Sequence, residues 1–416
     1  MHSEIVEIRG HLIDTATLSR VLNDVGEYGG DYVVERFDIG HGTDDPSYAR
    51  INVSAESEES LQRILMRLQI HGVNQVDPGE AAIGLAEHDG VFPDGFYSTT
   101  NLETQVRLDG HWVRVLNPEM DCGLVVDAED SDGTGADVTV RTLPMSDVRA
   151  GMRIVCGASG IKVTVPISTK ADNSFGFMDS DVSSEKPQAV LVRQVADGMR
   201  EAKEAGKKVL WVGGPGVVHT GASQAMVALV EAGYVDVLFA GNALATHDIE
   251  SALYGTSLGI DLARGQGVEH GHEHQIRAIN TIRKAGSIRA AVEQGVLTSG
   301  IMHSLVTHGK EFVLVGSVRD DGPLPDVYTD VIEGQRAMRA QLGDAGFCLM
   351  VATMLHSVAT GNILPASVPL VCVDINPATV TKLADRGSSQ ARGIVTDVGL
   401  FLEQLAMELA PTYRRA

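Results

Sequence analysis

The sequence KKVLWVGGPGVVHTG, residues 207–221, decides the fold of the C-terminal half of this chain of 416 residues. Its apolar run Val209–Val212 has the length of a buried strand, and a helical pattern begins near Ala222, directly after the glycines. Glycines let the backbone come close to a phosphate group, and the free N–H groups at the start of the next helix attract an anion. This order of strand, glycine loop and helix predicts a loop that holds a pyrophosphate, with Gly214 and Gly216 as contact residues.

The glycine loop differs from the common dinucleotide fingerprint G-x-G-x-x-G, because His219 stands where the third glycine would be. A tight turn between a strand and a helix that binds no ligand would leave a similar pattern. The loop alone therefore leaves both interpretations open.

The pattern from residue 188 onward favours a parallel sheet. After a helical pattern over Val190–Ala205, short apolar runs alternate with amphipathic helical stretches, which is typical of an α/β domain. Because the runs are hydrophobic throughout, we expect strands that are buried on both faces and covered by helices. The predicted strands are Val209–Val212, Val235–Ala240, Phe312–Ser317, Cys348–Thr353, Val368–Asp374 and Ile394–Thr396.

Polar side chains follow five of these predicted strands, at the edge where open α/β sheets bind their ligands. A carboxylate in such a place suits the two hydroxyls of a ribose, although a single acid there is more often a helix cap. Five polar strand ends that meet at one edge favour a nucleotide site. The residues are Asn242 with Ala243, Asp320 with Asp321, Thr353 with Met354, Leu355 and His356, Asp374, and Asp397 with Val398.

The first hundred residues have the pattern of a small α+β domain. Strand-like runs and helical stretches follow one another in the order β-α-β-β-α, and Ser57 is placed to cap the second helix. This order predicts a ferredoxin-like or ACT-like domain over residues 1–100, with elements at 3–13, 17–28, 31–39, 48–54 and 58–70.

The chain between this domain and the glycine loop changes character. Residues 104–166 carry short β-branched runs separated by glycine turns, and residues 167–187 show no periodicity. We expect a small β subdomain with a linker over residues 101–187. The remaining residues, 188–416, then form the nucleotide-binding α/β domain.

Net charge restricts the possible partners. The chain carries 55 acidic and 33 basic side chains, for a formal charge of −22. Such a field repels the phosphates of nucleic acids and of anionic lipid headgroups, so we expect neither as a partner. The first lysine is Lys162. An acidic, lysine-poor chain hints at a cytoplasm of high salt content.

Cysteine usage and the N-terminus indicate a cytoplasmic protein. The four cysteines form no Cys-x-x-Cys pair and no short disulfide framework, which fits a reducing compartment. The first ten residues lack the basic and apolar regions of a signal peptide, and no apolar run approaches the roughly 18 residues of a membrane helix.

Two further clusters could carry chemistry. Glu269–His274 offers imidazoles and carboxylates that suit zinc or iron, but alternate histidines at a helix start cannot share a face, so we expect no metal. Asn117–Cys122 places Glu119 and Asp121 beside the thiol of Cys122. A nucleophilic cysteine would need a nearby base, and a buried cysteine at a strand start is the simpler interpretation.

Six long motifs together resemble those of the archaeal-type, NAD-dependent ornithine cyclodeaminase family. Its members share the conserved region of the plant lysine-ketoglutarate reductase/saccharopine dehydrogenase protein and the C-terminal part of cyanobacterial arginine-degrading enzymes. The resemblance extends over essentially the whole chain. The motifs are Gly95–Asn101, Asn117–Cys122, Val182–Pro187, Gly241–Ala243, Ser317–Pro325 and Ala352–His356.

This resemblance implies conversion of L-ornithine to L-proline and ammonia, with NAD reduced and re-oxidised within one catalytic cycle. The ring would close by attack of the substrate's own δ-amine, which proximity favours. A Rossmann-like domain similar to that of deoxyhypusine synthase is also implied, and it would account for His219 in the loop. The implied NAD contacts are Asn242, Ala243, one of Asp320 and Asp321, Thr353, Met354, Leu355, His356, Asp374, Asp397 and Val398.

The catalytic roles are hypotheses, drawn from the polar strand ends and from the Asn117–Cys122 cluster. Asp320, Asp321, Asp121 and Glu119 are candidate acids for the cationic amines of ornithine, and His356 is a candidate proton carrier. Two other functions stay open: an NAD-dependent dehydrogenase or reductase of the lysine or saccharopine type, and a non-catalytic module that senses NAD and an amino acid. We expect a homo-oligomer, either a dimer or a tetramer.

Overall fold

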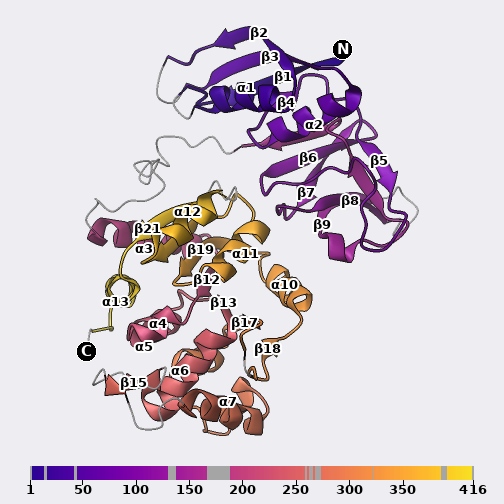
Figure 1. Cartoon of the computed structure of the whole chain (residues 1–416). Helices are drawn as coiled ribbons and strands as arrows, with labels where there is room; N and C mark the ends of the chain where they lie inside the picture. The colour runs from indigo at the N-terminus through magenta and orange to yellow at the C-terminus, as the bar shows by residue number, and fades with distance from the viewer. Residues whose placement is uncertain are drawn as a thin grey trace. The chain divides into compact units, whose positions relative to one another are not determined.

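The chain divides into two compact units in this computed structural model (Figure 1). The first unit comprises Met1–Gly176 and Asn362–Ser367, and the second comprises Phe177–Gly361 and Val368–Ala416. The structure describes residues 2–13, 16–41, 45–129, 137–165, 188–257, 260–261, 266–267, 273–320, 322–385 and 391–414.

The first unit begins with a four-stranded antiparallel sheet in the order β2-β3-β1-β4. Side chains of β3 are alternately buried because one face of the sheet packs against the two helices. Ser57 caps α2 as predicted, since its side chain accepts the N–H of Ser60. The elements are β1 (His2–Gly10), α1 (Thr17–Glu27), β2 (Asp31–Asp38), β3 (Ser47–Ala55), α2 (Glu58–Gln69) and β4 (Asn74–Gln75).

A second, seven-stranded sheet completes the first unit, in the order β11-β6-β7-β9-β8-β10-β5. It is a mixed sheet, because β7 and β9 run parallel while the other neighbours run antiparallel. The predicted linker lies outside the described residues. The elements are β5 (Ala82–Leu85), β6 (Glu103–Leu108), β7 (His111–Leu116), β8 (Gly123–Glu129), β9 (Asp137–Leu143), η1 (Met145–Asp147), β10 (Arg153–Cys156) and β11 (Ile161–Thr164).

The second unit is built on a parallel sheet in the order β18-β17-β13-β12-β19-β20-β21. All six predicted strands are present, and their inner residues are buried on both faces, as continuous hydrophobicity predicts. The strands are β12 (Lys208–Gly213), β13 (Val237–Gly241), β17 (Glu311–Val315), β18 (Val327–Tyr328), β19 (Ala345–Val351), β20 (Leu370–Asp374) and β21 (Ala391–Val395).

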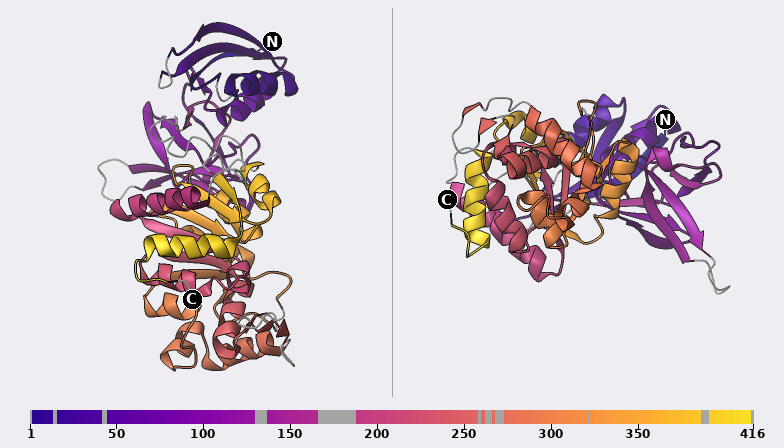
Figure 2. Two further views of the ribbon diagram at one scale, coloured as in Figure 1. Left: turned by 90° about the vertical axis from the view of Figure 1, so that its left-hand side faces the viewer. Right: turned by 90° about the horizontal axis from the view of Figure 1, so that it is seen from below.

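Helices cover this sheet, and α3 and α13 lie side by side along it (Figure 2). None of the helices that the structure describes is long and apolar enough to cross a membrane. A small separate sheet consists of β14 (Thr256–Ser257), β15 (Ile260–Asp261) and β16 (Gln266–Gly267). The helices are α3 (Gln188–Glu204), α4 (Gly216–His219), α5 (Ser223–Glu231), α6 (Asn242–Tyr254), α7 (His274–Ala285), α8 (Ile288–Glu293), α9 (Ile301–Thr307), α10 (Val331–Ala340), α11 (Leu355–Ile363), α12 (Pro377–Asp385) and α13 (Val398–Leu409).

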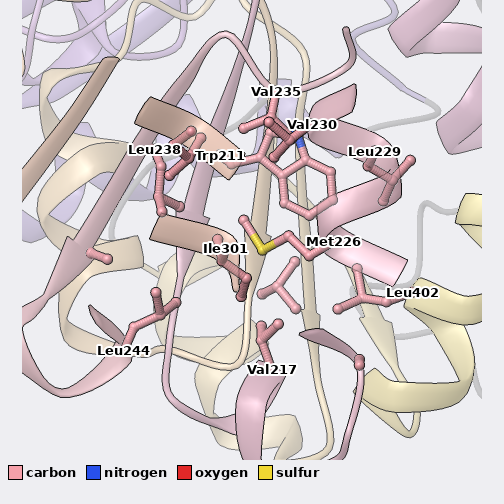
Figure 3. Packing of buried hydrophobic residues seen from close by; sticks show 14 of the residues in the cluster. Trp211, Val217, Met226, Leu229, Val230, Val235, Leu238, Leu244, Ile301 and Leu402 are labelled. Carbon is pink, nitrogen blue, oxygen red and sulfur yellow. The ribbon is translucent and has the colours of Figure 1, made fainter. Parts of the chain in front are cut away.

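Trp211 fixes β12, the strand that leads into the glycine loop. Its ring is fully buried among side chains that include Met226 and Leu229 of α5 (Figure 3). A buried indole N–H needs a partner, and this one donates to the carbonyl oxygen of Tyr234 at 2.8 Å. Removing such a ring from a core costs about 3–5 kcal/mol, so the strand has a firm anchor just before the loop.

Candidate functional site

The strand order of the second unit reverses its direction between β12 and β19. β12 and β19 are neighbours, and the chain continues from them to opposite sides, to β13 and to β20. Numbered along the chain, β12, β13, β17, β19, β20 and β21 lie in the order 3-2-1-4-5-6, which is that of the Rossmann fold. Dinucleotides bind outside the carboxyl ends of the strands at this reversal point.

The two loops at the reversal point touch through their backbones. The N–H of Gly214 donates to the carbonyl oxygen of Val351 at 2.9 Å. A Cβ on Gly214 would lie 1.9 Å from the carbonyl oxygen of Ala352, and one on Gly216 would lie 2.9 Å from the Cβ of Ala352. Ala352 itself has a φ of 54°, a strained conformation of the kind that clusters at functional sites. Loop packing therefore requires both glycines, whatever the ligand.

Three of the predicted acids lie at the ends of their strands or up to five residues beyond them, and they are held in the same way. One carboxylate oxygen of each accepts a backbone N–H in its own turn, which fixes the side chain. For Asp397 this bond is the N-cap of α13, so the simpler interpretation as a helix cap holds at that position. The bonds are Ser317 N to Asp320 Oδ2 (2.7 Å), Asn376 N to Asp374 Oδ1 (2.8 Å) and Leu400 N to Asp397 Oδ1 (2.7 Å).

Asn242 is buried at the first position of α6 and organises the neighbouring loop. Its side-chain oxygen accepts the N–H of Leu324 at 3.0 Å and the hydroxyl of Thr246 at 3.3 Å. Leu324 follows Asp320 by four residues in the chain. The oxygen of the Asn242 amide thus joins two strand ends, and its Nδ2 group is the part that could still face a ligand.

His356 lies at the start of α11 and covers Gly241, the last residue of β13. A Cβ on Gly241 would lie 2.9 Å from Nε2 of His356, so a larger residue there would push against the imidazole. Burial lowers the pKa of His356, while the negative charge of Asp320 acts in the opposite direction. The imidazole is therefore neutral at neutral pH and able to accept a proton, beside a fixed carboxylate.

The remaining predicted NAD contacts differ in exposure. Leu355 is 71% exposed and Met354 42% exposed, whereas Val398 is buried in the hydrophobic core. Large exposed apolar side chains at the carboxyl edge of a sheet are available to a ligand, but Val398 could offer only its backbone. Asp321 lies outside the described residues.

Asp121 and its neighbours belong to the first unit and form a tight loop there. Asn117 and Asp121 have φ values of 47° and 60°, and Asp121 is exposed. Glu119 and Cys122 are buried, and the Cys122 thiol donates to Oε1 of Glu119 at 2.8 Å. The prediction of a buried cysteine at a strand start is confirmed, since β8 begins at the next residue.

Metal binding finds no support among the described residues, which contain no group of three or more His, Cys, Asp or Glu side chains suited to an ion. Residues 269–272 of the histidine cluster lie outside them. Cys348 and Cys372 are buried in β19 and β20, and burial raises the pKa of both thiols, so neither is a ready nucleophile.

Sequence reasoning missed a buried polar group in α6. His247 and Glu250 are both buried, and Nδ1 of His247 lies 2.9 Å from Oε2 of Glu250. Their spacing of three residues on a helix would have shown that they can pair. Nothing in the sequence, in contrast, signals the left-handed conformation of Ala352.

Three family models match successive parts of the chain. Residues 3–102 match the LOR/SDH bifunctional enzyme conserved region, and residues 103–192 match the first region of the arginine dihydrolase ArgZ-like C-terminal part. Residues 193–405 match the Rossmann fold of that same C-terminal part. The chain is 51% identical over 410 residues to the ornithine cyclodeaminase of Methanothermobacter thermautotrophicus, with 98% of each protein covered.

Solved structures agree with this assignment. The chain is similar to apo ArgZ, an arginine dihydrolase from the ornithine-ammonia cycle in cyanobacteria, with a TM-score of 0.84 and 36% identity over 99% of this chain and 59% of ArgZ. It is also similar to AgrE in its ternary complex with ornithine and NAD+, with a TM-score of 0.52 and 40% identity over 98% of this chain and 57% of AgrE. This chain belongs to the archaeal ornithine cyclodeaminase family, with its LOR/SDH conserved region and its ArgZ-like C-terminal regions.

Proposed function

We propose that this chain is an ornithine cyclodeaminase that converts L-ornithine to L-proline and ammonia, with NAD reduced and re-oxidised within one cycle. The observation that carries the proposal is the group formed by His356, Asp320 and the first turn of α6 at the carboxyl edge of a Rossmann sheet. It combines a neutral base and a carboxylate at the edge where a nicotinamide cofactor binds. Full-length similarity to ornithine cyclodeaminases supports the choice of substrate.

The residues present fit NAD. The two loops at the reversal point of the sheet meet through Gly214, Gly216 and Ala352, and the neighbouring strand ends carry fixed carboxylates. Each carboxylate uses one oxygen for its own turn, which leaves the other for a ribose hydroxyl. Gly214 and Gly216 would hold the pyrophosphate, together with the backbone at Thr353.

We infer which end of the dinucleotide lies on which side of the reversal point, because the strand ends on the two sides carry different side chains. On the β20 side, Asp374 suits the adenosine ribose, and Ile375 is 69% exposed and can lie under the base. On the side of β13 and β17, His356 and Asp320 suit the reacting end of the cofactor and the substrate. His356 and Asp320 would then lie on the same side as the nicotinamide and the substrate, as a hydride transfer requires.

When bound, NAD would supply the hydride chemistry, as the acceptor for the hydride of the ornithine α-carbon and, once reduced, as the donor to the cyclic imine. His356 would accept the proton of the substrate's α-ammonium group, because its lowered pKa keeps the ring neutral. Asp320 would attract the cationic amines and stabilise the protonated imidazole. Asp321 and Asp121 stay candidates for the second amine.

Finer features of the fold are part of the same proposal. We infer that the β-α-β-β-α-β unit at the N-terminus is a ferredoxin-like or ACT-like domain, because its sheet order is β2-β3-β1-β4. The nucleotide domain would be of the deoxyhypusine-synthase type. The expected dimer or tetramer stays a prediction.

The test is turnover of ornithine by the pure protein with NAD and no added reductant. We expect one proline and one ammonia per ornithine consumed, without net NADH, measured by amino-acid analysis and by absorbance of NADH. Accumulating NADH would instead indicate a dehydrogenase. Binding of NAD and ornithine without turnover would indicate a sensor, and either result would overturn the proposal.

A further inference from the structure

A polar cluster of two buried side chains and one exposed one lies next to the glycine loop, and the proposed mechanism does not use it. His219 is the last residue of α4, the short helix that follows the loop, and His247 and Glu250 are in α6. The side chains of His247 and Glu250 are only 6% and 0% exposed. Burying a carboxylate is costly unless it is paired and hydrogen-bonded, so this arrangement needs an explanation.

Hydrogen bonds fix the Glu250 side chain through both of its oxygens. Nδ1 of His247 lies 2.9 Å from Oε2, and the hydroxyl of Thr256 donates to Oε1 at 2.9 Å. Because Thr256 has one proton and gives it to Glu250, its oxygen accepts a proton from Nδ1 of His274 at 2.8 Å. The start of α7 is thereby connected to α6 through β14.

His219 attaches the end of the glycine loop to this cluster. Its ring meets the ring of His247 edge to face, with centroids 4.8 Å apart, and its Nδ1 lies 2.7 Å from the hydroxyl of Ser257. Partial burial and the neighbouring His247 lower the pKa of His219, so it is neutral at neutral pH and the two rings do not repel each other.

The loop is therefore held at both of its ends. At the start, the N–H of Gly214 donates to the carbonyl oxygen of Val351, and at the end His219 contacts α6 and β14. A loop fixed in this way needs no ordering when a ligand binds, and lower ordering costs raise affinity.

We propose that His219, His247 and Glu250 are positioning residues that hold the glycine loop in the conformation that binds the pyrophosphate of NAD. The proposal rests on the proposed function for the identity of the ligand. It predicts that the cluster sets the affinity for NAD and leaves the chemical step unchanged, because none of its side chains belongs to the reacting group of His356 and Asp320.

The first experiment replaces His219 with alanine and titrates NAD into nucleotide-free protein by calorimetry. His219 is exposed at the end of a short helix, so the variant should fold. We expect its Kd for NAD to rise about tenfold, with kcat at saturating NAD within about twofold of the unchanged protein. His308→Ala, at the exposed end of α9, is the matched control and should leave both values unchanged.

A pair of variants at Glu250 separates geometry from charge. Glu250→Gln keeps groups that can hydrogen-bond to His247 and Thr256, so its Kd for NAD should stay within about threefold of that of the unchanged protein. Glu250→Ala removes these groups and should weaken the binding of NAD at least as much as His219→Ala. If Glu250→Gln raises the Kd for NAD as much as Glu250→Ala does, the result would contradict the positioning role.

Two other results would overturn the inference. One is an unchanged Kd for NAD in His219→Ala, whatever happens to kcat, and the other is a raised Kd together with a fall in kcat at saturating NAD well beyond about twofold. In both cases the unchanged protein still binds NAD, so the proposed function survives. If the unchanged protein itself binds no NAD, the proposed function fails and this inference fails with it.

Discussion

At the scale of single residues, His356 is the side chain whose chemistry can be checked most directly. It contacts Gly241 and lies near Asp320, and burial lowers its pKa below the ordinary value of about 6.5. A base works only when it is unprotonated. We therefore expect kcat/KM to be constant above neutral pH and to fall as the pH drops through the lowered pKa of His356, measured as initial rates of proline formation.

Replacing His356 with asparagine should lower kcat by at least about 100-fold, which is the usual contribution of a general base. His303→Asn, on α9, is the control and should retain both the rate and the acidic limb of the profile. Retention of the acidic limb in His356→Asn would assign that limb to another group and would remove His356 from the mechanism.

The sequence predicts which strand ends are polar, but it does not predict what their side chains bond to. Asp320, Asp374 and Asp397 stand where the apolar runs end, so a pattern of burial is enough to find them. Asn242, in contrast, is bonded to Leu324, 82 residues further along the chain. Such a contact depends on how strands are paired in space, which local periodicity does not contain.

At the scale of elements, the glycine loop and the β19 loop form one packed unit. A Cβ on Gly214 would lie 1.9 Å from a carbonyl oxygen of the other loop, and backbone cannot move aside as a flexible side chain would. Gly214→Ala should therefore lower the free energy of unfolding by about 1–3 kcal/mol through overpacking. It should also raise the Kd for NAD by about tenfold or more. Thermal unfolding and calorimetric titration of NAD check the two effects.

Gly343→Ala is the matched control for Gly214→Ala. Gly343 has open space at its Cβ position and no positive φ, and both changes reduce the freedom of the unfolded chain equally. We expect Gly343→Ala to keep the affinity for NAD and to be neutral or slightly stabilising. Equal behaviour of the two variants would show that the two loops separate easily, contrary to the close contact of Gly214 with Ala352.

Elements with strong periodicity were predictable and short ones were not. The six buried strands follow from hydrophobic runs, and α3 follows from the helical pattern over Val190–Ala205. The short helix α4 was not predicted, because its four residues, Gly216–His219, resemble a turn in the sequence. Its position depends on contacts with α6 and β14 that are made only after folding.

At the scale of the whole molecule, the chain is not divided into consecutive units. Asn362–Ser367 belongs to the first unit, where Asn101 donates from its side chain to the carbonyl oxygen of Leu364, 263 residues away. The carbonyl oxygen of Asn362 also accepts the N–H of Met120 at 2.9 Å. No change in composition marks this segment, so sequence reasoning placed its domain boundaries only along the chain.

The excess of acidic side chains should make the stability of the protein depend on salt. The chain carries 55 acidic and 33 basic side chains, and at a net charge of −22 the acidic groups repel one another in the folded state. Raising KCl from about 0.1 M to about 1 M shortens the Debye length from about 10 Å to about 3 Å, which screens this repulsion. We therefore expect the Tm, followed by circular dichroism, to rise steadily over this range. A neutral osmolyte at equal osmolality is the control and should not reproduce the full gain. A Tm that is flat or falls with KCl would mean that ion pairs such as Arg67–Asp24, which salt also screens, outweigh the repulsion.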